Sequence, residues 1–167
     1  MKILIFLHGT VLMHKNAIGK SRKERVLQVK TKEKSVYEFA SYIPIDNAAR
    51  TIRNWSEYGA EIYYLSPHKR IHDALIDKTI LIKNNFPNGT VLYRKKGEEY
   101  KDVAERIKPD IIIEDDCESI GGEKEMVYPS LEKNIKSKIK SIVVHEFGGI
   151  DHLPKGKYAL LKYNPTK

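Results

Sequence analysis

The stretch that decides the fold is Met1-Lys2-Ile3-Leu4-Ile5-Phe6-Leu7-His8-Gly9-Thr10. Its continuous apolar run over residues 3–7 is typical of a strand buried on both faces, as in a parallel sheet. Gly9 favours a turn directly afterwards, because glycine lets the backbone bend tightly and pass close to a ligand. We therefore expect a buried strand over residues 2–7, with polar groups just beyond its carboxyl end.

Predicted strands and helices alternate along the rest of the chain. Further strands are expected over residues 61–65, 90–93, 110–114 and 141–145, with a candidate last strand over 158–163. Helices are expected over residues 46–59, 70–84, 98–107 and 130–140. Such alternation predicts an α/β fold, a Rossmann-like three-layer sandwich with a central parallel sheet, in a single domain over residues 1–167. In such sheets, ligands bind at the carboxyl ends of the strands.

Residues 11–45 form a basic insertion or flap after the first strand. From His14 to Lys34 there are eight basic residues and two acidic ones. Partial alternation over 24–30 and the aromatic-rich stretch 36–43 favour a small β-hairpin here. A solvated, lysine-rich surface explains this charge more simply than a nucleic-acid patch, because charge carries no sequence readout and no aromatic residue lies between His14 and Lys34.

The composition excludes several other classes of protein. The 167 residues carry a net charge of +8, which favours polyanions as neighbours, and 41% of them are hydrophobic, as in an ordinary globular domain. The single cysteine, Cys117, rules out an internal disulfide and a zinc site built from cysteines. No apolar run approaches the roughly 20 residues that span a bilayer. We expect a cytoplasmic protein with no membrane partner.

Polar residues follow the predicted strands in an order that resembles the haloacid dehalogenase (HAD) superfamily. In that family the first strand ends in Asp-x-Asp-Gly-Thr, the first Asp being the nucleophile and the second the general acid/base. Four segments carry the resemblance: Leu4–Thr10, Tyr63–Ser66, Lys101, and Ile111–Asp116. The resemblance covers most of the chain as element order and only a handful of residues as motif.

The resemblance implies a phosphate site at the strand ends. It assigns Gly9, Thr10, Ser66 and Lys101 to phosphate binding, through hydroxyl, amide and ammonium donors. It assigns Asp115 and Asp116 to Mg²⁺, a hard cation that prefers oxygen ligands. The short inserts imply a minimal cap, and minimally capped members tend to act on macromolecules or other large substrates. The basic insertion would then border an open cleft.

The chain departs from the family pattern at both catalytic positions, where it has Phe6 and His8. A phenyl ring cannot attack phosphorus, so Phe6 abolishes the aspartyl-phosphate route and removes a metal ligand. His8 can still act as an acid or base, because an imidazole titrates near neutrality.

Simpler interpretations exist for several of these residues. Asp115 and Asp116 also fit a helix N-terminus, where carboxylates satisfy free N–H groups. Lys101 also fits a surface lysine, and Phe6 a core residue. His8 and His14 with the acids could form a transition-metal site, although their spacing matches no known motif. Residues 145–149 either line the same cleft or form a glycine-containing loop.

Three hypotheses for the function follow. The first is a HAD-like domain without aspartyl-phosphate catalysis, which binds a phosphorylated small molecule or macromolecule. The second is a Mg²⁺-dependent phosphohydrolase that uses water activated by His8 or by the acids. The third is a nucleic-acid-associated module that uses the basic insertion.

Overall fold

The computed structural model describes residues 1–164 and confirms the predicted α/β architecture. Five parallel strands form the central sheet in the order β5-β4-β1-β6-β7. Their bounds are β1 Lys2–Phe6, β4 Glu61–Leu65, β5 Thr90–Leu92, β6 Ile111–Asp115 and β7 Lys140–Val144. In the register, Phe6 lies opposite Leu65, and Asp115 lies opposite Val144. The strands therefore end together, and β1 is at the centre.

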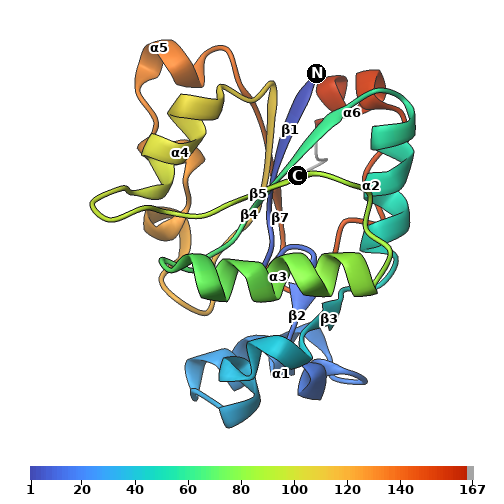
Figure 1. Ribbon diagram of the computed structural model, residues 1–167, viewed down its shortest axis with the longest axis vertical. Coiled ribbons are helices and arrows are strands. Elements are labelled where there is room, and N and C mark those ends of the chain that lie inside the picture. The colour runs from blue at the N-terminus through green and yellow to red at the C-terminus, as the bar shows by residue number, and fades with distance from the viewer. Residues whose placement is uncertain (165–167) are drawn as a thin grey trace.

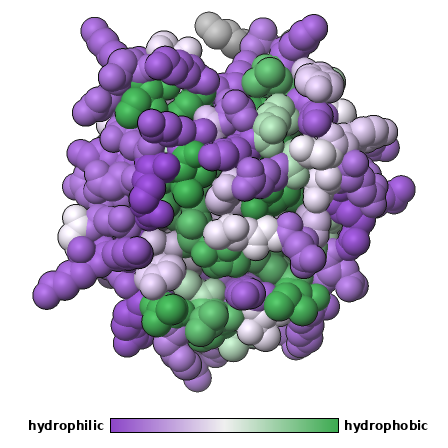
Figure 2. All heavy atoms as spheres, turned by 45° about the horizontal axis from the view of Figure 1, so that its top comes forward, coloured by the Kyte–Doolittle hydropathy of each residue, from purple (hydrophilic) through white to green (hydrophobic). Residues whose placement is uncertain are grey.

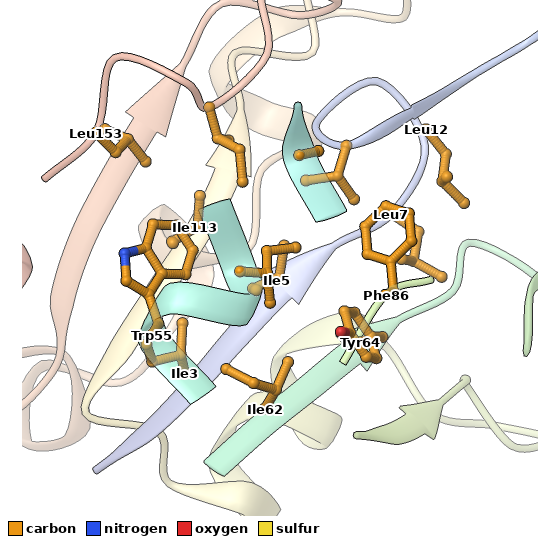
Figure 3. Packing of buried hydrophobic residues seen from close by; sticks show 14 of the residues in the cluster. Ile3, Ile5, Leu7, Leu12, Trp55, Ile62, Tyr64, Phe86, Ile113 and Leu153 are labelled. Carbon is orange, nitrogen blue, oxygen red and sulfur yellow. The ribbon is translucent and has the colours of Figure 1, made fainter. Parts of the chain in front are cut away.

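Helices cover both faces of this sheet (Figure 1). One face packs against α2 Ala48–Glu57, α3 Ile71–Lys83 and α6 Lys157–Lys162, and the other against α4 Tyr100–Ile107 and the short α5 Lys133–Lys136. Successive residues of β1 point to opposite faces, so Ile3 and Ile5 pack with Trp55 on the first face (Figure 3). Leu4 packs with Val103 on the second face. This alternation is why every residue from 3 to 5 is fully buried.

The insertion after β1 is helical and not a β-hairpin over residues 24–30, so that prediction was wrong. Its main element is α1 Arg22–Lys30, which begins with a capping box between Ser21 and Glu24. That box satisfies free N–H groups at the helix start and favours a helix over a strand. The only strands of the described insertion are β2 Leu12–Met13 and β3 Ile43–Pro44, an antiparallel pair at its two ends.

Short 3₁₀ turns complete the insertion and the segment between β6 and β7. Their bounds are η1 Lys15–Ala17, η2 Lys34–Tyr37, η3 Phe39–Ser41, η4 Gly122–Glu125 and η5 Tyr128–Ser130. The predicted helix over 130–140 is thus reduced to α5. The candidate strand over 158–163 is wrong as well, because this segment is α6, whose one fully buried side chain is Leu160.

The predicted first helix begins two residues later than expected. Asp46 has a φ of 47°, a left-handed conformation that ends the preceding segment, and Asn47 is the N-cap of α2. The prediction for α3 is confirmed to within one residue at each end.

The outer surface is mostly hydrophilic, with scattered apolar patches on the face in Figure 2. Among the exposed large apolar side chains, Ile71, Leu75 and Ile82 belong to α3. Within residues 1–164, no helix is both long and apolar enough to cross a membrane.

Candidate functional site

A cavity of about 340 Å³ lies at the carboxyl ends of the central strands. Phe6, His8 and Gly9 line it from the end of β1, and Glu114 and Asp115 from the end of β6. The insertion lines the cavity with apolar and aromatic side chains from α1, η2, η3 and the residue after η3. These are Val29, Val36, Tyr37, Phe39 and Tyr42. The insertion therefore borders the cavity with apolar groups, and not with the basic ones that we expected.

Three carboxylates beside the cavity form an acidic cluster, defined here as Asp115, Asp116 and Glu146. One oxygen from each lies within 4.8 Å of the others. Asp115 ends β6 and Glu146 follows β7, so the parallel pairing of these strands brings the two side chains together. Gly9 packs against them, because a Cβ atom at this position would lie 2.9 Å from Asp115 Oδ2 and 3.2 Å from Glu146 Cγ.

Hydrogen bonds fix the orientation of each carboxylate in the acidic cluster. Thr10 Oγ1 donates to Asp115 Oδ2 at 2.8 Å, and the Cys117 amide donates to Oδ1 at 3.0 Å. Ser119 donates to Glu146 through its amide at 2.7 Å and its hydroxyl at 2.6 Å. These donors leave the carboxylates positioned, with further lone pairs available to a cation.

Burial controls the protonation of these acids. It raises the pKa of Asp115 and Glu146, and the neighbouring carboxylates raise both further. Burial also raises the pKa of Glu114 to about 7. Asp116 differs: burial alone would raise its pKa, but hydrogen bonds from His145 and the Glu146 amide, with Arg22 nearby, lower it. The cluster therefore combines one ionised carboxylate with two that are costly to ionise.

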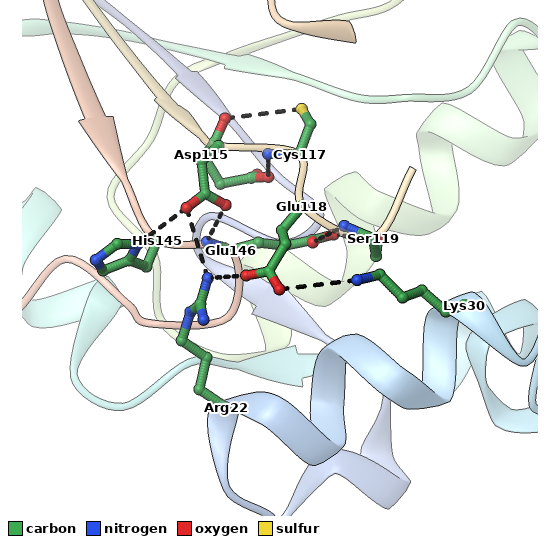
Figure 4. Close-up of polar contacts among 9 residues, drawn as sticks. Arg22, Lys30, Asp115, Cys117, Glu118, Ser119, His145 and Glu146 are labelled. Atoms are coloured by element: carbon green, nitrogen blue, oxygen red, sulfur yellow. Dashed lines mark hydrogen bonds and ion pairs between the residues drawn. The ribbon is translucent and has the colours of Figure 1, made fainter. Parts of the chain in front are cut away.

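Basic residues of α1 neutralise part of this negative charge (Figure 4). Arg22 Nη2 lies 3.5 Å from Asp116 Oδ2 and also pairs with Glu118, and Lys30 Nζ lies 3.8 Å from Glu118. Arg25 donates to the Phe147 carbonyl at 3.1 Å. Part of the basic insertion is thus engaged within the molecule, and nucleic-acid binding by it stays a prediction.

On the other side of β1, two histidines surround a buried carboxylate. His8 Nε2 lies 2.9 Å from Asp77 Oδ1, and His68 Nε2 lies 3.9 Å from Asp77 Oδ2. Burial would raise the pKa of Asp77, but hydrogen bonding and attraction from His8, with Ser66 and His68 nearby, lower it. Burial lowers the pKa of His68. His8 and His68 line the cavity, together with Phe39 and Tyr42, which contact their rings.

Phe6 lines the cavity from the end of β1. Its ring packs edge-on against Tyr100, with 5.5 Å between the centroids. The Arg94 guanidinium lies over the Tyr100 ring, 3.8 Å from its centroid. Arg94 also donates a hydrogen bond to the Pro67 carbonyl. An apolar and aromatic surface thus lies at the end of β1.

The other residues that the sequence singled out occupy different environments. Thr10 and Ser66 are fully buried behind the cavity, where Thr10 supports Asp115 and the Ser66 hydroxyl accepts a hydrogen bond from the His68 amide. Lys101 is not brought to the site: its side chain is 42% exposed and pairs with Glu99 at 3.0 Å. Tyr100 and Lys101 are the first two residues of α4 and point in different directions. The Tyr100 ring lines the cavity, and the Lys101 side chain faces solvent.

Sequence reasoning missed His68 and Asp77. His68 follows Ser66 by two residues, so its place after a strand could have marked it. Asp77 lies within α3, with Ala74, Ile80 and Leu81 as the other buried residues of that helix. An acid on the apolar face of a helix is a usable signal, because unpaired charges are rarely buried.

Comparison with known proteins supports the fold. No protein-family model matches the chain, and no curated protein is similar to it in sequence. Two solved structures of the class C acid phosphatase from Bacillus anthracis are similar to it. One, with tungstate bound, has a TM-score of 0.56 at 15% identity and covers 89% of this chain and 68% of its own. The other has a TM-score of 0.57 at 16% identity, covering 89% and 67%. These two likenesses show that the chain shares the overall α/β fold of these phosphatases.

Proposed function

We propose that this chain is a HAD-like domain that binds a phosphate ester at the carboxyl ends of β1, β4 and β6 without forming an aspartyl-phosphate. One observation carries the proposal: Phe6 lines the cavity beside Asp115, at the position where the resemblance places a nucleophilic carboxylate. The likeness to acid phosphatases supports a phosphate ester as the ligand class.

The charge of the cavity makes a cation necessary for this binding. Among residues 1–164, the lining includes four carboxylic acids, Glu114, Asp115, Glu125 and Glu146, and no lysine or arginine. A phosphate placed here is repelled by the ionised acids in a medium of low dielectric constant. The chain therefore needs a divalent ion, or protonated histidines, to hold the phosphate.

The acidic cluster fits Mg²⁺ by its donor set. All of its ligand atoms are carboxylate oxygens, which Mg²⁺ prefers. When bound, Mg²⁺ would supply positive charge to the phosphate oxygens. Thr10 and Ser119 hold Asp115 and Glu146 in orientation. Arg22 competes with the ion, because it already pairs with Asp116.

A second candidate function is phosphate-ester hydrolysis by water, which the contact between His8 and Asp77 favours. At 2.9 Å, the Asp77 carboxylate can orient the imidazole and stabilise its protonated form. His8 would then accept a proton from the attacking water or donate one to the leaving oxygen. This chemistry replaces the covalent route that Phe6 excludes.

Two measurements on the full chain test the proposal. Calorimetric binding of a non-hydrolysable aryl phosphonate is measured with and without Mg²⁺, and phosphate release from an aryl phosphate is measured under the same conditions. We expect Mg²⁺-dependent binding that Asp115→Asn weakens, whereas Glu123→Gln, a change at an exposed acid of η4, leaves it unchanged.

The outcomes separate the two candidates. Binding without turnover supports the ligand-binding domain. Turnover that is lost in His8→Gln supports the hydrolase. Binding that ignores both Mg²⁺ and Asp115→Asn contradicts the proposed site.

A further inference from the structure

We propose that His8, His68 and Asp77 form a binding site for a transition-metal ion of the Zn²⁺ type, separate from the acidic cluster. We call these three residues the histidine site. The proposal goes beyond phosphate binding and does not rest on it. The family resemblance does not assign this site.

The sheet brings the three side chains together from distant parts of the chain. His8 follows β1 and His68 follows β4, and these strands pair in parallel, with Phe6 opposite Leu65. Asp77 reaches the same place from the middle of α3. The two histidines therefore emerge from adjacent strand ends over a carboxylate supplied by the covering helix.

The spacing of the ligand atoms is close to that of a tetrahedral metal complex. Ligands at about 2.0–2.1 Å from Zn²⁺ are separated from each other by roughly 3.3 Å. The Asp77 carboxylate lies 2.9 Å from His8 Nε2 and 3.9 Å from His68 Nε2, and one ligand atom from each of the three residues lies within 4.8 Å of the others. The two distances to Asp77 lie on either side of the tetrahedral value.

Two buried atoms of this site have no hydrogen-bond partner within the described part of the chain. They are His68 Nε2 and Asp77 Oδ2, which face each other, and the two side chains are only 9% and 0% exposed. Leaving a buried polar atom unpaired is unfavourable, because the atom has lost its hydrogen bonds to water and gained none in return. A single cation between them would satisfy both atoms at once.

The ligand set favours a different ion from the one expected at the acidic cluster. Two imidazoles and one carboxylate suit Zn²⁺ and related ions, whereas three carboxylates suit Mg²⁺. Three protein ligands also leave a coordination position open. His8 and His68 both line the cavity, so the open position would face the cavity.

Aromatic side chains hold the histidine rings in place. The ring centroids of Tyr42 and His8 are 4.5 Å apart, and those of Phe39 and His68 are also 4.5 Å apart. Such fixed orientations support metal ligation, because ligand rings are usually held by their surroundings. The Nε2 atom of His8 can carry either a proton or the ion, so the metal site and the acid/base role exclude each other.

Titration of the chelator-treated full chain with Zn²⁺, in the presence of excess Mg²⁺, tests the proposal. Calorimetry should give one equivalent of Zn²⁺ for each chain, and Co²⁺ in its place should give the strong visible absorption of a four-coordinate ion. Because loss of a partner outside the ligand shell already costs roughly 10–100-fold in affinity, loss of the ligand in His68→Gln should cost at least about 100-fold.

Matched variants identify the site. His72→Gln changes an exposed histidine of the same helix as Asp77 and should leave Zn²⁺ affinity unchanged. Asp115→Asn should also leave it unchanged. If His68→Gln does not fold, the Co²⁺ spectrum of the unaltered chain decides. Absence of Zn²⁺ binding, the weak spectrum of six-coordinate Co²⁺, or Zn²⁺ affinity that depends on Asp115 would overturn the proposal.

Discussion

Replacing Glu114 by glutamine should reveal a buried carboxyl group whose ionisation opposes folding. Glu114 is 1% exposed, and its carboxylate accepts hydrogen bonds from the amides of Val127 at 2.7 Å and Tyr128 at 2.9 Å. These bonds tie the end of β6 to the segment that leads into η5. Burial nevertheless raises the pKa of this group from 4.5 to about 7.

Because the pKa of Glu114 is raised in the folded state, its contribution to the free energy of unfolding depends on pH. A carboxyl group with a higher pKa in the folded state binds more protons there than in the unfolded chain, so its contribution is favourable at low pH and is lost as the pH rises from about 4.5 to 7. At about 1.4 kcal/mol for each pH unit, the shift corresponds to a loss of about 3 kcal/mol above pH 7.

Glu114→Gln removes this dependence on pH. The glutamine amide has one acceptor oxygen, so one of the two backbone N–H groups loses its partner, at a cost of roughly 1–3 kcal/mol. The variant should therefore be less stable than the unaltered chain near pH 5. Above pH 7 the difference should shrink to about zero or change sign.

Urea denaturation of both proteins at several values between pH 5 and pH 8 measures this difference. Subtracting the two curves cancels the contributions of Asp115 and Glu146. Glu123→Gln, at an exposed position, serves as the control and should show no such trend. A difference in the free energy of unfolding that stays constant over the whole range would refute the reasoning.

Three further changes test other parts of the site. Gly9→Ala should destabilise the fold by roughly 1–3 kcal/mol, since φ is +82° and the new Cβ would lie 2.9 Å from Asp115 Oδ2; unchanged urea denaturation would contradict this. Arg22→Gln should strengthen Mg²⁺ binding measured by calorimetry, because it removes the cation that pairs with Asp116; weaker binding would count against the acidic cluster as the Mg²⁺ site. Phe6→Asp combined with His8→Asp should create Mg²⁺-dependent release of phosphate from an aryl phosphate, and a folded but inactive double variant would contradict the assignment of these two positions.

The central sheet was predictable from sequence because burial on both faces leaves a strong pattern. Strands such as Ile111–Asp115 are short apolar runs between polar turns, and no competing signal acts on them. The basic insertion was harder to predict. Val26 and Gln28 are both buried, which resembles the alternation of a strand, but Ser21 and Glu24 cap a helix before them. The helix cap at Ser21 therefore outweighed the weak strand-like alternation, and the segment is a helix.

The candidate site was only partly predictable. Asp115 ends β6 and Gly9 lies three residues after β1, so the sheet geometry places both at the cavity, where the sequence led us to expect them. The direction of a helical side chain is set by packing, and this explains the result at Lys101. The neighbouring Tyr100 packs against Phe6 inside the fold, which turns the lysine toward Glu99 and solvent. Asp77 was missed because only tertiary structure brings α3 over His8.

The resemblance to the HAD pattern implies two differences at the end of β1, and both would change the chemistry of the site in the same direction. Aspartates at positions 6 and 8 would add two carboxylates to a cavity that Asp115 and Glu146 already line, which favours a hard cation. Phe6 instead supplies an apolar ring, and His8 supplies a nitrogen that contacts the Asp77 carboxylate of α3. Compared with that pattern, the end of β1 would offer fewer oxygen ligands on the side of β6 and a nitrogen ligand on the side of β4. For this reason the affinities for Mg²⁺ and Zn²⁺ should respond to different substitutions, Asp115→Asn for the first and His68→Gln for the second. A single substitution that abolished both would show that the two sides act as one site.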